Sequence, residues 1–480
     1  METRGFTRAV PLGLALLGLL WHGLWATTVP GPLDWDPAYY RDVAQHILAG
    51  EGAVSGAAWQ AALTAGPLPV PADLHWMPLP SRVLLPGLAL WPARGDQLTT
   101  ALLAAAWAPL AWALARALGL RPAAAALAGL WAATGLGWVR FLSTPDVFAL
   151  YGVIGAVGWL AVLRGATGWA AASAVAAALS RGDGFLFGVA LGLGLGGARG
   201  AAVGGAGLAA AGAWGAWALQ SGAAAAVDLR AAALHAPDIG AFIEGVTAPR
   251  GLGPRLRALP AELRQLPATA LVAGAGLLPL AAAAGAAVLR RQRAVGSALA
   301  FLLGAPLVGL VLAPAIAASG SPFRSWSALA CLGAALGAAG VDALELRLVA
   351  RGWRPGALLL LVGIGAVAAA GAIGRGNRAA RPEAPVDCGP LAGLPADVVV
   401  LTGRPLLVRA RCGRSAVVLT RATPPAEAAA RAGRTGAAYA LLPEADPDRS
   451  VPLRADAARL LPGWTELRPG LFVAPHGAAR

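Results

Sequence analysis

The chain has 480 residues, of which 57% are hydrophobic and only 13% are charged, and its mean hydropathy is +0.63. Soluble domains carry about 25% charged residues, so the composition excludes an ordinary soluble protein and indicates a surface that mostly faces lipid. All 38 basic residues are arginines, and the net charge is +14. These arginines lie mainly between hydrophobic segments, where anionic lipid is the nearer partner, so binding of nucleic acid is not predicted.

The first hydrophobic segment, residues 10–29, follows Arg4 and Arg8. It is longer than the apolar part of a signal peptide, and no A-x-A cleavage site follows it. We therefore interpret it as a signal anchor whose N-terminus lies in the cytoplasm.

Further hydrophobic segments follow along the chain. Since a hydrocarbon core of about 30 Å needs about 20 apolar residues per helix, the sequence predicts about eleven spans. These are residues 10–29, 98–118, 123–142, 147–163, 166–180, 184–198, 201–220, 268–289, 294–317, 325–343 and 355–374. The predicted fold is mostly α: a polytopic transmembrane helix bundle over residues 1–374, with a small C-terminal α/β domain.

The loops between the predicted spans indicate the orientation. Alternate short loops carry arginines and almost no acids: Arg116, Arg121, Arg164, Arg199, Arg290, Arg291, Arg293, Arg347, Arg351 and Arg354. Positive residues stay on the cytoplasmic side. The other side then receives two long loops, 30–97 and 221–267, the second read as a helix or two at the membrane surface. The protein is predicted to lie in a bacterial inner membrane.

Residues 375–480 contain dense charge and no predicted span. Strands are expected at residues 398–401, 416–419, 438–442 and 471–474. One helix is expected at residues 424–432, and a second helix is expected to end at residues 460–464. An odd number of spans places this α/β domain outside the cytoplasm, and we expect it to fold on its own, without catalytic residues. Cys388 and Cys412 form one disulfide there or remain two free thiols, whereas Cys331 is a packing residue within a span.

The first outer loop holds the most distinctive pattern, residues 34–50. Asp36 before Pro37 indicates a helix N-cap and first helical position, and Gly50 is a suitable helix stop. Apolar residues between them repeat at helical spacing, which predicts an amphipathic helix on the membrane surface. Two readings of Asp36 stay open: a helix cap, or a general base at the mouth of a membrane cavity.

Other polar motifs lie at predicted outer ends of spans. They are His75-Trp76-Met77-Pro78-Leu79, Ser143-Thr144-Pro145-Asp146, Leu179-Ser180-Arg181-Gly182-Asp183-Gly184 and Ser321-Pro322-Phe323-Arg324-Ser325-Trp326. Each has a structural reading: arginines at span ends reach lipid headgroups, Asp146 caps a helix, Arg181 pairs with Asp183, and His75 and Trp76 anchor a loop at the interface.

In order and spacing, these motifs resemble the GT-C class of membrane glycosyltransferases, which includes the protein O-mannosyltransferases and the lipid A aminoarabinose transferase. The family motif after the first span usually reads Asp-Glu-x-x-Tyr. Asp36 and Tyr40 match it, while Pro37 stands where Glu is usual. The resemblance covers roughly residues 10–345.

The resemblance implies transfer of a sugar from a polyprenyl-phosphate carrier to an acceptor outside the cytoplasm. Asp36 would be the catalytic base. The candidate substrate-binding residues are Asp34, Tyr40, His75, Trp76, Arg140, Asp146, Arg181, Asp183 and Arg324. The implied partners are the lipid-linked sugar donor, membrane lipids and an envelope acceptor. No cofactor is predicted, and no Cys/His metal spacing occurs. A transporter or flippase of lipid-linked sugars and a non-catalytic scaffold are the alternatives.

Overall fold

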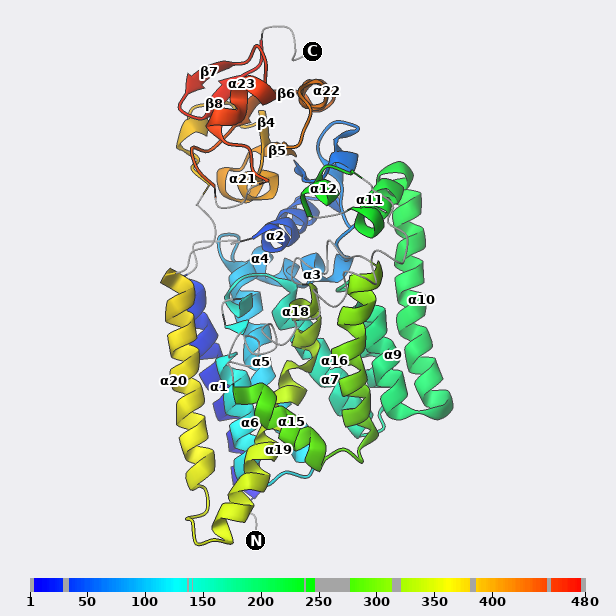
Figure 1. The fold of residues 1–480 in the computed structure, drawn as a ribbon, viewed down its shortest axis with the longest axis vertical. Helices are drawn as coiled ribbons and strands as arrows, with labels where there is room; N and C mark the ends of the chain where they lie inside the picture. Colours follow the sequence, from blue (N-terminus) through cyan, green and yellow to red (C-terminus); the bar gives the residue numbers. More distant parts are fainter. Residues whose placement is uncertain are drawn as a thin grey trace.

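The computed structural model describes residues 4–28, 34–135, 138–139, 141–236, 239–246, 277–312, 321–379, 386–446 and 450–475. A bundle of long helices forms one end of the molecule, and a small α/β domain forms the other. The segment between the first two long helices lies between these two parts (Figure 1).

The bundle confirms the mostly helical prediction. Its helices are α1 (Arg4–Thr27), α5 (Gly95–Ala117), α6 (Pro122–Thr134), α7 (Val147–Leu163), α8 (Thr167–Ala178), α9 (Gly184–Leu195), α10 (Gly197–Ser221), α15 (Leu277–Val288), α16 (Arg293–Leu312), α19 (Ala330–Val349) and α20 (Ala357–Ala379). In the described part of the chain, four helices are long and apolar enough to cross a membrane by length and composition. The span count stays a prediction.

One predicted span is too long. The segment 123–142 was expected as a single helix, but α6 ends at Thr134, and Gly135 caps it with φ +66°. Glycine adopts this left-handed conformation without a Cβ penalty, so it ends the helix. The next helix, α7, begins after the 3-10 helix η3 (Phe141–Ser143), and Asp146 is its N-cap.

Small residues let the helices approach closely. A Cβ atom at Gly155 of α7 would clash with the backbone of Ala328, and one at Gly285 of α15 would clash with the carbonyl of Leu336 in α19. Membrane helices associate largely through such small-residue packing, because lipid offers no hydrophobic driving force between them.

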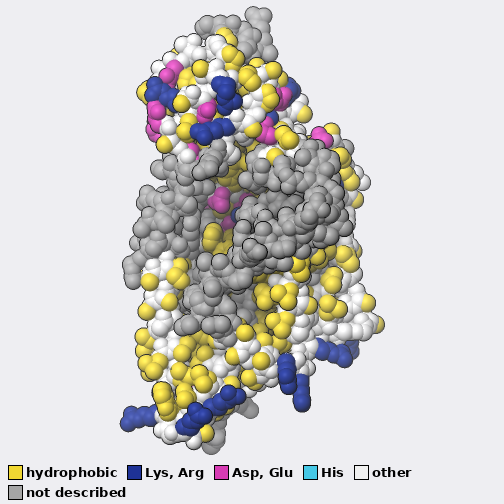
Figure 2. Space-filling view, viewed as in Figure 1, with side chains coloured by type: hydrophobic (Ala, Val, Ile, Leu, Met, Phe, Trp, Pro, Cys, Tyr) yellow, Lys and Arg dark blue, Asp and Glu magenta, His cyan; other side chains and the backbone are white. Residues whose placement is uncertain are grey.

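Arginine side chains gather at the end of the bundle opposite the α/β domain (Figure 2). Arg121 there pairs with Asp342 and lies 3.2 Å from Glu345. The Glu345 carboxylate accepts hydrogen bonds from the backbone N–H groups of Gly356 and Leu359 at the start of α20, each at 3.0 Å. These contacts join α6, α19 and α20 at the arginine-rich end, which is the predicted cytoplasmic side.

Reporter fusions test this orientation. We expect alkaline phosphatase to be inactive when fused after Gly200 and active when fused after Arg375, because arginine-rich loops stay in the cytoplasm. The enzyme activity of each fusion, normalised to its amount, is the measurement. The opposite result at either position would contradict the proposed orientation.

The segment after α1 forms a folded cover on the bundle. It comprises α2 (Trp35–Leu48), β1 (Val54–Ser55), β2 (Ala57–Ala58), the 3-10 helix η1 (Ala61–Thr64), β3 (Val70–Pro71), α3 (Pro78–Val83) and α4 (Leu85–Leu90). The second long loop contains α11 (Ala223–His235) and α12 (Ile239–Ile243), while residues 247–276 lie outside the described ranges. The position of this loop at the membrane surface stays a prediction.

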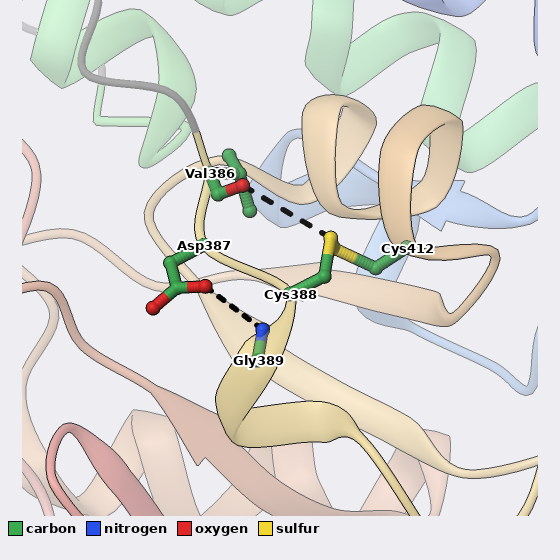
Figure 3. Close-up of a disulfide and its surroundings, with 5 residues drawn as sticks. All are labelled: Val386, Asp387, Cys388, Gly389 and Cys412. Atoms are coloured by element: carbon green, nitrogen blue, oxygen red, sulfur yellow. Dashed lines mark hydrogen bonds between the residues drawn. A yellow bond between two sulfur atoms is a disulfide. The ribbon is translucent and has the colours of Figure 1, made fainter.

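The C-terminal domain contains the elements β4 (Val399–Thr402), α21 (Pro405–Cys412), β5 (Ser415–Val418), α22 (Pro425–Thr435), β6 (Ala437–Leu441), α23 (Ala457–Leu460), β7 (Thr465–Arg468) and β8 (Leu471–Val473). The four predicted strands are confirmed within one residue at each end, while α21 and β7 were not predicted. Cys388 and Cys412 form a disulfide (Figure 3), with Cα atoms 5.5 Å apart.

The sheet of this domain is not confined to the C-terminal segment. Its strand order is β2-β5-β4-β6-β8-β7, so β2 of the first loop forms one edge. Strand β2 runs parallel to β5, with Ala57 opposite Ala416 and Ala58 opposite Val417. Independent folding of residues 375–480 stays a prediction, and an isolated fragment would lack this edge strand.

Candidate functional site

Helix α2 begins two residues earlier than its sequence pattern predicts, at Trp35 instead of Pro37. Asp34 is the N-cap, and its Oδ1 accepts a hydrogen bond of 2.7 Å from the N–H of Trp35. Asp36 therefore lies inside the first turn, and the prediction that it caps the helix is wrong. Pro37 is tolerated there because N–H groups of a first turn have no helical partner. The predicted stop is confirmed, since Gly50 has φ +79°. The Asp36 side chain is thus available for another role.

Three carboxylates surround the guanidinium of Arg324. This arginine lies on α18 (Ser321–Trp326), and its Nη2 is 3.2 Å from Asp36 Oδ2, 3.9 Å from Asp34 Oδ2 and 3.9 Å from Asp146 Oδ2. Asp146 also caps α7, accepting a hydrogen bond of 2.6 Å from the Val147 N–H. The predicted capping role of Asp146 is therefore correct, and the same side chain also faces Arg324.

This acid–arginine cluster lies at the end of the bundle nearest the α/β domain, where acidic side chains are visible in a recess of the surface (Figure 2). The Asp36 and Arg324 side chains are 15% and 19% exposed, whereas Asp146 is 2% exposed. Among the described residues, Arg324 Nε is buried without a hydrogen-bond partner. A buried donor without a partner is costly, so this N–H is suited to an incoming anion.

A second arginine lies beside the first. Arg181, between α8 and α9, donates from Nε to Asp183 Oδ1 at 2.8 Å and from Nη2 to Asp183 Oδ2 at 3.1 Å. Ser325 joins this pair to α18, because its hydroxyl contacts Asp183 and lies 3.2 Å from Arg181 Nη2. The internal pair predicted from the sequence is thus present, and it adjoins the residue that follows Arg324.

Tyr40 lies one helical turn after Asp36 and is almost fully buried. Burial raises the pKa of its hydroxyl well above the usual value, and the carboxylates of Asp36 and Asp146 raise it further. The phenol is therefore protonated and uncharged at neutral pH, next to the charged cluster.

The two aromatic candidates of the first loop lie in a separate group of rings. The His75 ring centroid is 5.3 Å from that of Trp59, 5.4 Å from that of Trp76 and 5.2 Å from that of Phe242. Burial lowers the pKa of His75 to about 4, so the imidazole is neutral at pH 7. Trp76 also packs on Tyr39, with centroids 4.3 Å apart. These contacts support the structural reading of His75 and Trp76 as loop packing.

Most of the predicted site residues therefore converge. Asp34, Asp36, Tyr40, Asp146 and Arg324 form one cluster, and Arg181 with Asp183 adjoins it. Arg140 lies outside the described residues. In the described part of the chain, no three His, Cys, Asp or Glu residues are arranged to hold a metal ion.

A second polar group, which the sequence pattern did not predict, lies buried at the other end of α2. Asp42 is 2% exposed, and its carboxylate accepts hydrogen bonds from Ser55 Oγ at 2.8 Å, Gly56 N–H at 2.9 Å and Arg409 Nε at 2.8 Å. His46 lies 3.4 Å from the same carboxylate and 2.5 Å from Glu51. The only sequence signal was an Asp and a His at positions i and i+4 on the polar face of a helix.

Hydrogen bonds and neighbouring charges shift the pKa values of His46 and Asp42. The bond to Asp42 raises the pKa of His46, although burial lowers it in part. Burial would raise the pKa of Asp42, but the hydrogen bond from His46 and the charge of Arg409 outweigh burial and lower it. The protonated imidazole and the carboxylate therefore stabilise each other in the folded protein.

This raised pKa makes stability depend on pH. The contribution of His46 is fully present below the unfolded-state pKa of about 6.5 and is lost as the pH rises through the higher folded-state value. We expect the unfolding temperature of the wild type to fall relative to that of His46→Gln between pH 6 and pH 8. His75 has a lowered pKa and the opposite dependence, and comparing the two proteins cancels it. An equal change with pH in both would contradict this assignment.

No family model matches the sequence, and no curated protein matches it either. The structure, however, matches ArnT from Cupriavidus metallidurans bound to undecaprenyl phosphate, with a TM-score of 0.54 and 13% identity over 100% of both chains. The chain has the fold of the GT-C membrane glycosyltransferases. The resemblance seen in the motifs is therefore confirmed at the level of the fold, and the long apolar helices in the described part of the chain agree with a multi-pass membrane protein.

A second GT-C structure, the oligosaccharyltransferase of Archaeoglobus fulgidus, also matches. Its apo form gives a TM-score of 0.52 and 13% identity, covering 91% of this chain and 69% of that chain. The same protein, AglB, in complex with an inhibitory peptide and a dolichol-phosphate gives a TM-score of 0.50 and 14% identity, with the same coverage. At these identities the comparison concerns the fold, and the chemistry depends on the residues of the cluster.

Proposed function

We propose that this protein is a glycosyltransferase that moves a sugar from a polyprenyl-phosphate carrier to an acceptor outside the cytoplasm. The observation that carries the proposal is the contact between Asp36 and Arg324. A partly exposed carboxylate lies 3.2 Å from a guanidinium whose Nε is buried without a partner among the described residues. The GT-C fold supports the proposal, because two proteins of that fold were solved with undecaprenyl phosphate and dolichol-phosphate.

The two side chains suit the two charges that develop in sugar transfer. The acceptor oxygen forms a bond to the anomeric carbon, and the bond from that carbon to the phosphate oxygen breaks. Asp36 takes the proton of the acceptor hydroxyl, while the leaving phosphate keeps the electron pair. An oxocarbenium-like transition state links these events.

Arg324 is placed to receive the leaving group. Its Nη2 faces Asp36, while its Nε N–H has no partner in the described part of the chain. A phosphate oxygen bound at Nε would let one guanidinium contact both the base and the leaving group. Charge-assisted bonds of this kind are about twice as strong as neutral ones, and they are most effective on charge that develops in the transition state. Arg181 and Tyr40 are further polar side chains next to this position.

A transfer assay with purified protein tests the proposal. Wild-type protein and polyprenyl-phosphate sugars are incubated with extracts of envelope acceptors, and products are identified by mass spectrometry. We expect loss of the sugar from one donor and its appearance on an acceptor. Mass spectrometry of a deletion strain should show the same donor accumulating and the acceptor lacking that sugar. An unchanged set of glycans and lipid-linked sugars in the deletion strain would contradict the proposal.

The alternatives are a flippase of lipid-linked sugars and a scaffold without catalysis. A flippase would change the sidedness of the donor without forming a glycosidic bond. Its function would not need Asp36 as a base, so an Asp36→Asn variant would keep it. A scaffold would leave donor and acceptor unchanged in the purified system.

A further inference from the structure

Helix α2 is held at both ends by different parts of the protein. Its N-terminal turn places Asp36 against Arg324. Its C-terminal half places Asp42 and His46 against the C-terminal domain, where Arg409 Nε is 2.8 Å from Asp42 Oδ1 and Arg409 Nη2 is 3.2 Å from His46 Nε2. Asp36 and Asp42 are about 9 Å apart along the axis at a rise of 1.5 Å per residue, so a tilt at one end moves the other.

Backbone groups of the first loop link α2 to the C-terminal domain. Asp42 accepts hydrogen bonds from Ser55 and Gly56, which directly precede β2. Gly56 in turn accepts a hydrogen bond of 3.1 Å from the N–H of Ala416 in β5. A Cβ atom at Gly56 would lie 2.6 Å from Arg409 Nε. Only glycine leaves room for this arginine, so the loop strand and the arginine fit one another closely.

A second buried ion pair fixes the same domain from another side. Arg431 of α22 donates to Glu244 Oε2 at 2.7 Å, and both side chains are 3% exposed or less. Thr420 and Thr423 each donate to Glu244 Oε1 at 2.6 Å. Breaking a buried pair is strongly destabilising, so the domain cannot easily swing away from α12 and the first loop. Its α21 helix therefore gives α2 a fixed support.

We infer that the C-terminal domain positions the candidate base: Arg409 and Asp42 hold helix α2 so that Asp36 stays against Arg324. Both are positioning residues, since neither touches the acid–arginine cluster. The inference rests on the proposed function for its effect on turnover. That Arg409 restrains helix α2 is a separate claim about the structure, and it does not depend on any enzymatic activity.

The test compares Arg409→Gln with Arg454→Gln. Arg454 is a matched control because its partners, Glu444 and Glu466, lie in the same domain and far from α2 in the sheet. Hydrogen exchange of the α2 amides is measured first. We expect faster exchange over residues 38–48 in Arg409→Gln and no change in Arg454→Gln. Equal exchange in both variants would overturn the inference, whatever the protein catalyses.

Turnover is measured second, per molecule of bound donor. Since a displacement of about 1 Å at a reacting group can cost up to about 100-fold in rate, we expect slower turnover in Arg409→Gln with an unchanged donor-binding stoichiometry. The Asp42→Asn, Arg409→Gln double variant should be no slower than the slower single variant, because both changes remove the same contact. Turnover that falls only in parallel with binding stoichiometry would show a general folding defect and overturn the positioning role. A wild type that transfers no sugar would instead refute the proposed function.

Discussion

Replacing Asp36 with Asn should lower the rate of sugar transfer by about 10²–10⁴-fold, the usual effect of losing a general base. The change keeps the size of the side chain and leaves the helix cap intact, because Asp34 and not Asp36 caps α2. It removes only the charge beside Arg324 and the ability to take a proton. The measurement is single-turnover transfer from a polyprenyl-phosphate sugar.

Asp228→Asn on α11 is the matched control, since that side chain is exposed and lies outside the cluster. The control should transfer sugar at the wild-type rate. A well-folded Asp36→Asn protein with near-normal transfer would end the assignment of Asp36 as the base. Asp36 would then be only an ion-pair partner of Arg324. Such a result would favour a scaffold or a flippase over a transferase.

Replacing Arg324 with Lys should lower the rate of transfer by about 10²–10³-fold, the usual effect of losing one donor to a developing charge. Lysine keeps the positive charge among Asp34, Asp36 and Asp146 but loses the planar fork of donors. The loss should appear in turnover, because the phosphate gains charge as the bond to the sugar breaks. Turnover and donor affinity are measured separately on the purified protein.

The control for placing a lysine in this chain, whose basic residues are all arginines, is Arg351→Lys. Arg351 is exposed and lies at the arginine-rich end of the bundle. If Arg324→Lys weakens donor binding and leaves the rate of the bound complex unchanged, the arginine contributes only to ground-state binding. Its assignment to the leaving group would then be wrong.

The sequence was sufficient for most helices of the bundle and for four strands of the C-terminal domain, while α21 and β7 were not predicted. Long apolar segments predict helices by length alone, and short apolar runs in the charged C-terminal segment predicted β4, β5, β6 and β8. The ordered motifs identified Asp36 and Arg324 as candidates. Their contact at 3.2 Å could not be predicted from either segment, because it depends on how α18 packs against the first turn of α2.

Two features escaped prediction for physical reasons. Strand β2 has two alanines, and two residues show no alternation of polar and apolar side chains from which a strand could be predicted. Asp42 lies on the polar face of an amphipathic helix, a pattern that indicates contact with water. In the protein that face is covered by α21 of a distant domain, so the amphipathic pattern identified the helix but not what covers its polar face.

The shared sheet has a consequence for how the protein is made. Asp42 and Arg409 are 367 positions apart, and ribosomes add about 5–20 residues per second, so roughly 20–70 s separate the synthesis of these two partners. During that time β2 has no β5 to pair with, and the polar face of α2 is not yet covered by α21. The first loop therefore stays incompletely folded until the C-terminal domain has been synthesised and can supply β5 and α21. Assembly of the acid–arginine cluster would then follow the synthesis of this domain, and a chain truncated before residue 405 would leave β2 as an open strand edge.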